Sequence, residues 1–117
     1  IYLKTGIETF DMISGVCKSI DPAIVVLIDS YGTKKLERVG CSLQLSSSGL
    51  VPGGAILGDK KLKAISKKTL KIPCITIGCP LMCFAEDGFV TILQNVDTVV
   101  ELLSQIAAEA INNAFSV

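Results

Sequence analysis

The stretch Ile24-Val25-Val26-Leu27-Ile28-Asp29 decides the fold that the sequence predicts. Its first five residues are apolar and do not alternate with polar ones, which is typical of a strand covered on both faces in a parallel sheet. The aspartate and the Ser30-Tyr31-Gly32 turn signal that follow predict that this strand ends at Asp29. The run therefore predicts the central strand, and the order helix, strand, strand, strand, helix along the chain indicates an α/β fold around it.

Asp29 is the candidate functional residue of this stretch. A carboxylate at the end of a buried strand lies at the rim of the sheet, where open α/β folds bind their ligands. The alternative is that Asp29 only caps the next segment through its side-chain oxygen. From the residues alone, both interpretations stay open.

The length and the charge of the chain limit the classes of protein to which it can belong. The 117 residues are 50% hydrophobic, which predicts a single α/β domain over residues 1–117. Eleven basic and eleven acidic side chains cancel, and Arg38 is the only arginine. The one local bias is a group of lysines, for which we predict a solvated face and no direct contact with nucleic acid: Lys60, Lys61, Lys63, Lys67, Lys68 and Lys71.

The same composition also bears on whether the protein spans a membrane, forms disulfides or binds a metal. No apolar run reaches the ~20 residues of a membrane helix, so no membrane partner is expected. The chain begins without methionine, and we expect it to be part of a longer polypeptide or a processed product. Without a histidine, neither a metal site nor another cofactor is expected. The five cysteines are predicted to be reduced, and mostly buried, in a cytoplasmic protein: Cys17, Cys41, Cys74, Cys79 and Cys83.

The N-terminal third predicts a strand remnant followed by a helix. Residues 1–3 are interpreted as the tail of a strand, and Thr5 with Glu8 matches a capping box. Apolar residues then recur at helical spacing as far as Ile20, and Asp21-Pro22 ends the helix. Because the capping box gives Glu8 a structural role, we do not count it as catalytic.

The remaining chain predicts short strands and a long C-terminal helix. Residues 34–38 predict a turn or a single helical turn, and residues 39–46 alternate like a half-exposed strand near a sheet edge. Ser66 is expected to cap a short helical turn, and residues 74–77 to form a buried strand ended by Gly78 and Pro80. We make no prediction for residues 81–93. From residue 96 one apolar stripe predicts a core-packing helix, with Asn95 as a plausible N-cap: Val96, Val99, Val100, Leu103, Ile106, Ala107, Ala110, Ile111 and Ala114.

The sequence also resembles the germination (spore) protease family. The resemblance is most specific in Thr5-Gly6-Ile7-Glu8-Thr9, followed by a helix, Asp21-Pro22 and a strand ending in Ile28-Asp29. It continues through most of the chain, in Glu37-Arg38-Val39, Leu43-Gln44-Leu45-Ser46, Ser48-Gly49, Pro52-Gly53, Ser66-Lys67-Lys68-Thr69-Leu70, Ile72-Pro73, Ile75-Thr76-Ile77-Gly78, Pro80, Val90-Thr91 and Val96-Asp97.

The resemblance implies an endopeptidase of the spore core that degrades small acid-soluble, DNA-protecting spore proteins during germination. It implies a mostly parallel sheet flanked by helices, akin to the hydrogenase-maturation peptidases and present here as a partial domain. It also implies a zymogen that assembles as a homo-oligomer. Proteolysis in this family is attributed to two aspartates. Asp29 matches one of them, and the other belongs to an N-terminal half of the domain that has no counterpart in this sequence.

Two neighbouring carboxylates suit this chemistry because they cannot both ionise easily, so that one keeps a proton while the other activates water. One aspartate alone is a poor base at neutral pH, and we expect this chain by itself to be inactive.

The chain departs from the family at Ser30-Tyr31-Gly32, at Val51-Pro52-Gly53-Gly54-Ala55 and at Leu81-Met82-Cys83-Phe84. A catalytically degenerate homologue that serves binding or assembly therefore remains the alternative. A nickel-dependent maturation peptidase would need a histidine ligand, and a nucleophilic cysteine enzyme would need a histidine partner for its thiol. The sequence contains no histidine, which argues against both.

Overall fold

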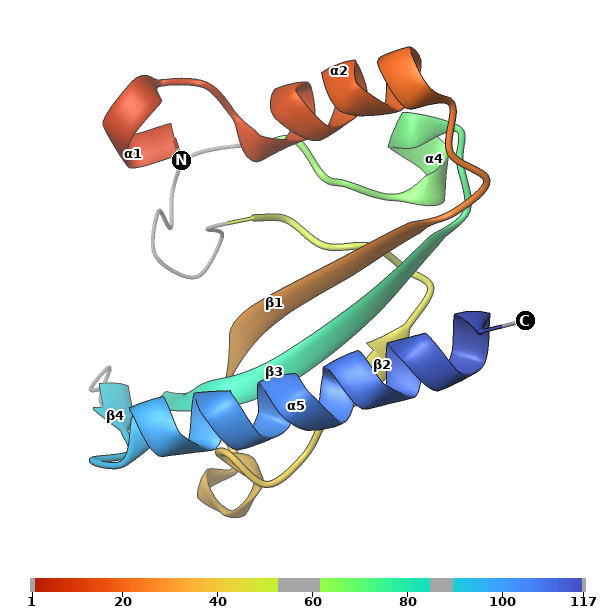
Figure 1. The fold of residues 1–117 in the computed structure, drawn as a ribbon. Coiled ribbons are helices and arrows are strands. Elements are labelled where there is room, and N and C mark those ends of the chain that lie inside the picture. The colour runs from red at the N-terminus through yellow and green to blue at the C-terminus, as the bar shows by residue number, and fades with distance from the viewer. Residues whose placement is uncertain (1, 53–61, 85–89, 117) are drawn as a thin grey trace. The chain divides into compact units, whose positions relative to one another are not determined.

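The computed structural model describes residues 2–52, 62–84 and 90–116, which contain both helices and strands, as expected for an α/β protein (Figure 1). In chain order the elements are α1 (Tyr2–Thr5), α2 (Thr9–Ile20), β1 (Val25–Thr33), η1 (Leu36–Arg38), β2 (Gln44–Ser46), α4 (Lys67–Leu70), β3 (Cys74–Phe84), β4 (Val90–Ile92) and α5 (Val96–Phe115).

The sheet is mixed. The strand order is β1-β3-β2, and β1 and β3 run in the same direction (Figure 1). β4 pairs antiparallel with β3, with Met82 opposite Ile92 and Phe84 opposite Val90. The structure thus combines a parallel pair with at least one antiparallel pair, and helices flank it. β2 lies at one edge of the strand order, as predicted for this segment.

The chain forms two compact units. The first contains residues 1–29 and 45–76, and the second contains residues 30–44 and 77–117. The single domain expected from the length stays a prediction.

In the first unit, local signals set the helix ends as the sequence predicts. α2 ends at Asp21, which adopts a left-handed conformation with φ 48° and donates its backbone N–H to the carbonyl oxygen of Cys17 at 2.9 Å. Ser66 caps α4, because its hydroxyl accepts from the backbone of Thr69 while the Thr69 hydroxyl accepts from the backbone of Ser66. Ile65, which is 1% exposed, lies in the core of this unit.

In the second unit, α5 forms where the apolar spacing predicts a helix. Its covered positions are a narrow stripe, consisting of Val96, Val99, Leu103, Ala107 and Ile111. The rest of the predicted core stripe is exposed, namely Val100, Ile106, Ala110 and Ala114. The prediction of a broad core-packing face on α5 was therefore wrong, because only one side of this helix is covered. Asn95 occupies the N-cap position but makes no side-chain capping bond.

β1 and β3 both continue through residues that were predicted to end them. β1 runs past Asp29 to Thr33, and β3 runs past Gly78 and Pro80 to Phe84. A Cβ at Gly78 would lie 2.9 Å from the ring of Tyr31, and a Cβ at Gly32 would overlap the ring of Phe84. Each glycine therefore leaves room for an aromatic ring from the neighbouring strand and does not make a turn.

Three further predictions about local structure were wrong. Residues 2–5 form α1 where a strand tail was expected. The Thr5 hydroxyl accepts from Ile7, and Glu8 is the N-cap of α2 without a side-chain capping bond, so the capping box does not form. Within residues 39–46, only Gln44–Ser46 is a strand. Of the turn or single helical turn predicted over residues 34–38, the structure has the helical turn, η1, over Leu36–Arg38.

Candidate functional site

Asp29 lies in the middle of a strand. It is the fifth of the nine residues of β1, and its side chain is exposed. Leu27 is buried at 8% exposure, whereas Ile28 is 61% exposed. The prediction of a strand covered on both faces and ending at the aspartate was therefore wrong for this chain. The alternative, in which Asp29 caps the next segment through its side-chain oxygen, stays a prediction, and the next described helical segment, η1, has Lys35 at its N-cap.

A second group of charged residues ties the start of α2 to the segment that precedes α4. The Lys63 ammonium lies 2.8 Å from Asp11 Oδ1 and 3.6 Å from Glu8 Oε2, and the Lys63 backbone N–H donates to Glu8 Oε1 at 3.0 Å. The hydrogen bond to Asp11 raises the pKa of the Lys63 ammonium. Both carboxylates are thus held by one lysine, and Glu8 has a structural role, although by this contact and not by the predicted capping box.

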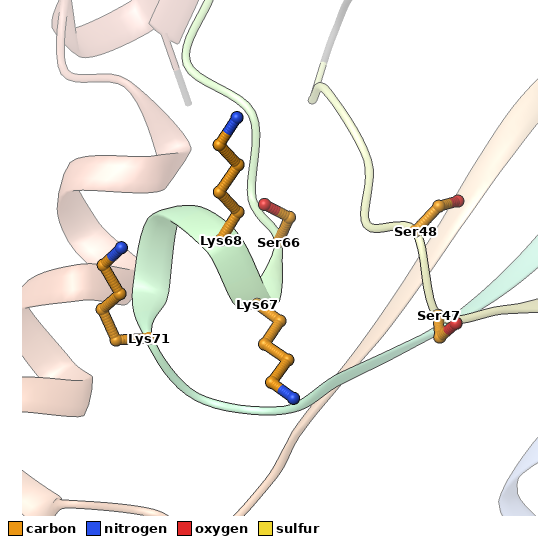
Figure 2. Close-up of a pocket in the computed structure, with 6 residues that line it drawn as sticks. All are labelled: Ser47, Ser48, Ser66, Lys67, Lys68 and Lys71. Carbon is orange, nitrogen blue, oxygen red and sulfur yellow. The ribbon is translucent and has the colours of Figure 1, made fainter.

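The lysine-rich segment surrounds an open hollow of about 660 Å³ in the first unit (Figure 2). It is lined by Ser47, Ser48, Ser66, Lys67, Lys68 and Lys71. Figure 2 shows the ammonium groups of Lys67 and Lys68 on opposite sides of α4, so they do not converge on one point. The exposed lysines Lys63, Lys67, Lys68 and Lys71 agree with the predicted solvated face, and Lys60 and Lys61 lie outside the described residues.

The cysteines are all free thiols. Cys17, Cys74 and Cys83 are buried, whereas Cys41 is exposed, in contrast to its expected burial. Burial raises the pKa of the Cys74 thiol, with a smaller contribution from Cys17, and burial also raises the pKa of Cys79. Within residues 2–52, 62–84 and 90–116, no group of three or more histidine, cysteine or acidic side chains is arranged to hold a metal ion.

An apolar groove in the first unit was missed by the sequence analysis. It lies along α2 and the beginning of β1, and the exposed residues Met12, Val16 and Ile20 form its helical side. The sequence signal was present, since Met12 and Val16 lie four positions apart beside the predicted stripe and continue it to Ile20, which that stripe contains and which is 65% exposed.

The comparison with protein families covers nearly the whole chain. The sequence model of the family described as germination protease, Peptidase_A25, matches residues 2–116. The chain belongs to the germination protease family.

Individual relatives match a shorter part. Germination proteases of Priestia megaterium, Oceanobacillus iheyensis and a Geobacillus species are 46%, 45% and 43% identical to the chain over 76 residues. These 76 residues are 65% of the chain and 20% of each relative, so the matched stretch spans about a fifth of the length of these relatives. Among the described residues, no helix is long and apolar enough to cross a membrane.

Proposed function

We propose that this chain provides one half of the active site of an aspartate-dependent endopeptidase that degrades small acid-soluble spore proteins in the spore core during germination. The observation that carries the proposal is the family match over residues 2–116, which includes the strand that bears Asp29. Membership of a peptidase family supports hydrolysis of a peptide bond. The substrate and the cellular site follow from the family resemblance.

In this proposal Asp29 is one of two catalytic carboxylates. Its exposed position on β1 leaves the side chain accessible to a substrate or to a second acid. The partner is an aspartate in the N-terminal half of the domain, outside this chain. When the two carboxylates approach each other, their repulsion keeps one protonated, and the ionised one removes a proton from the attacking water.

The complete protease, in this proposal, has a sheet like that of the hydrogenase-maturation peptidases and assembles as a homo-oligomer from a zymogen. The chain alone then lacks one catalytic group and is inactive. Activity appears only when the N-terminal half is supplied by the same polypeptide or by another chain.

A catalytically degenerate homologue that serves assembly is the second candidate. The observation that favours it is the residue that follows Asp29 by two positions. Tyr31 packs its ring against Gly78, and it lies in one of the stretches where the chain departs from the family. A large aromatic side chain next to the proposed catalytic position changes the space that a substrate peptide would need.

The test is the Asp29→Asn substitution in the full-length protein, with Asp97→Asn as the matched control, because Asp97 is also exposed but lies on α5. Loss of a general base costs about 10²- to 10⁴-fold in rate, so cleavage of a purified spore protein should fall at least a hundredfold, with an unchanged circular dichroism spectrum. Full turnover by Asp29→Asn would remove the catalytic role. An unsubstituted protein that does not cleave at all would favour the degenerate homologue.

A further inference from the structure

The first unit contains two cysteines, and both are buried free thiols. Cys17 lies on α2 and is 8% exposed, and Cys74 is the first residue of β3 and is 4% exposed. The other three cysteines of the chain belong to the second unit. Because Cys17 and Cys74 lie in the same unit, their relation does not depend on how the two units are placed.

Val25 connects the positions of the two thiols. Its backbone N–H donates to the carbonyl oxygen of Pro73 at 2.9 Å. In a pair of parallel strands the residue after the acceptor lies opposite the donor, so Cys74 lies opposite Val25 and projects from the same face of the sheet. Cys17 and Val25 line the same groove between α2 and the beginning of β1. Both thiols therefore lie in the layer between α2 and these two strands.

The two thiols also affect each other electrostatically. Burial raises the pKa of the Cys74 thiol, and the charge of Cys17 raises it further. Because the energy between two charges falls with their distance, this effect agrees with the placement of both sulfur atoms in one layer. The Cys74 thiol donates to the carbonyl oxygen of Ile72 at 3.3 Å, which is a weak bond that a reaction at the sulfur can break.

Two neighbouring thiols can hold a soft metal ion or form a disulfide. Structural zinc and iron–sulfur sites take about four protein ligands. Across residues 2–52, 62–84 and 90–116, the histidine, cysteine and acidic side chains form no group of three or more that could hold a metal. A disulfide needs no third group, so it is the chemistry that this pair can complete by itself.

We propose that Cys17 and Cys74 form a modification site, at which hydrogen peroxide converts the two thiols into a disulfide that ties α2 to β3. One peroxide oxygen is transferred to the Cys17 sulfur, which becomes a sulfenic acid, and the other oxygen leaves as water. The Cys74 sulfur then attacks the Cys17 sulfur, the S–O bond breaks, and a second water leaves with the Cys74 proton. Two thiols are oxidised, and one peroxide is reduced to two waters.

The environment of Cys74 suits the second of these steps. Its raised pKa leaves little thiolate at neutral pH, which makes it a poor group for the first attack on peroxide. The product joins two positions that are far apart in the sequence. A cross-link of this kind removes freedom mainly from the unfolded chain and holds α2 against the strand. The inference concerns the first unit alone and does not rest on the proposed activity.

The experiment treats the folded full-length protein with a small excess of hydrogen peroxide at neutral pH. The remaining thiols are blocked with N-ethylmaleimide, and the protein is digested with trypsin and analysed by mass spectrometry. The expected product is the peptide of residues 5–18 linked to the peptide that begins at Ile72, with the loss of two hydrogen atoms. Dithiothreitol should release both peptides.

Substitutions assign the partner of Cys17, because the peptide that begins at Ile72 also contains Cys79 and Cys83. Cys74→Ala should abolish the linked product. Cys79→Ala is the matched control, since Cys79 lies on the same peptide and the same strand but in the second unit, and it should leave the product unchanged. If Cys74→Ala does not fold, fragmentation of the linked peptides from the unsubstituted protein between residues 74 and 79 gives the same assignment.

Hydrogen exchange measures what the cross-link does to the fold. The backbone amides of α2 should exchange about tenfold more slowly after oxidation, because the helix can no longer separate from β3 in a local opening. The amides of α5, in the second unit, should exchange as before. Cys79→Ala should show the same protection of α2, and Cys74→Ala should show none.

Three results would overturn the inference. The first is the absence of a link between Cys17 and Cys74 after peroxide treatment. The second is a link that forms only when the protein has been unfolded in urea before oxidation. The third is an α2 that exchanges at the same rate with and without the link. None of these results bears on Asp29, because the assay measures no cleavage of a substrate.

Discussion

Replacing Ile65 by alanine tests where the core of the first unit lies. Ile65 is 1% exposed, and its backbone forms a bridge with Leu50 through hydrogen bonds of 2.9 Å and 2.7 Å. The substitution leaves this bridge in place and removes three carbon atoms. At about 0.8 kcal/mol for each carbon, the transfer contribution is roughly 2.4 kcal/mol. The cavity left behind raises the expected loss in the free energy of unfolding to about 3–4 kcal/mol.

The matched control is Ile20→Ala, which removes the same atoms from a side chain that is 65% exposed. Only about a third of the transfer contribution applies there, and alanine is a good helix former, so the loss should stay below about 1 kcal/mol. Urea unfolding followed by circular dichroism measures both values. With a slope of about 1–3 kcal/mol per molar, the Ile65→Ala midpoint should fall by about 1 M or more.

A milder substitution keeps the test informative if Ile65→Ala does not fold. Ile65→Val should cost about 0.5–1.5 kcal/mol. The reasoning is refuted if Ile65→Ala is no more destabilising than Ile20→Ala, since the burial difference between the two positions would then have no energetic consequence.

Two further predictions concern the second unit and the thiols. Gly32→Ala should lower the free energy of unfolding by about 1–3 kcal/mol, because the new methyl group overlaps the Phe84 ring. The double variant with Phe84→Leu should be less destabilised than the sum of the single variants, and strict additivity in urea unfolding would show that the contact does not matter. Alkylation of Cys74 by iodoacetamide, followed by mass spectrometry, should be slow at neutral pH and should accelerate only at a more alkaline pH than an ordinary thiol needs, because burial raises the pKa of this thiol and the thiolate is the nucleophile. The exposed Cys41 should react first, and because the folded state holds the Cys74 proton more tightly than the unfolded chain, stability should fall as the pH rises through the pKa of the unfolded thiol toward the higher pKa of the folded one.

The helices could be predicted because their signals are local. α2, α4 and α5 follow from apolar spacing and from residues next to their ends, such as Asp21 and Ser66. The N-terminal motif shows the limit of this approach. Thr5 and Glu8 match a capping box, but Glu8 bonds to the backbone of Lys63, which is 55 residues away in the sequence. A tertiary contact has replaced the local one, and the local motif carries no sign of it.

The strand ends could not be predicted, because their glycines act through packing. Gly32 and Gly78 are typical turn residues, yet each lies against a ring from the other strand. The candidate site was predictable only in part. Asp29 lies on the predicted strand, but the apolar run did not show how far that strand is covered, and Ile28 is 61% exposed. Its catalytic role stays a prediction.

The two contacts between a ring and a glycine also constrain how the alignment of β1 with β3 can change. Gly32 accepts the Phe84 ring from β3, and Gly78 accepts the Tyr31 ring from β1, so a slip by one residue would bring a ring against a Cβ at both places. Side chains alternate between the faces of a strand, and a residue inserted between Asp29 and Gly32 would therefore reverse the direction of the carboxylate relative to these contacts. The spacing between Asp29 and Gly32 therefore fixes the face of β1 on which the carboxylate stands relative to the two rings.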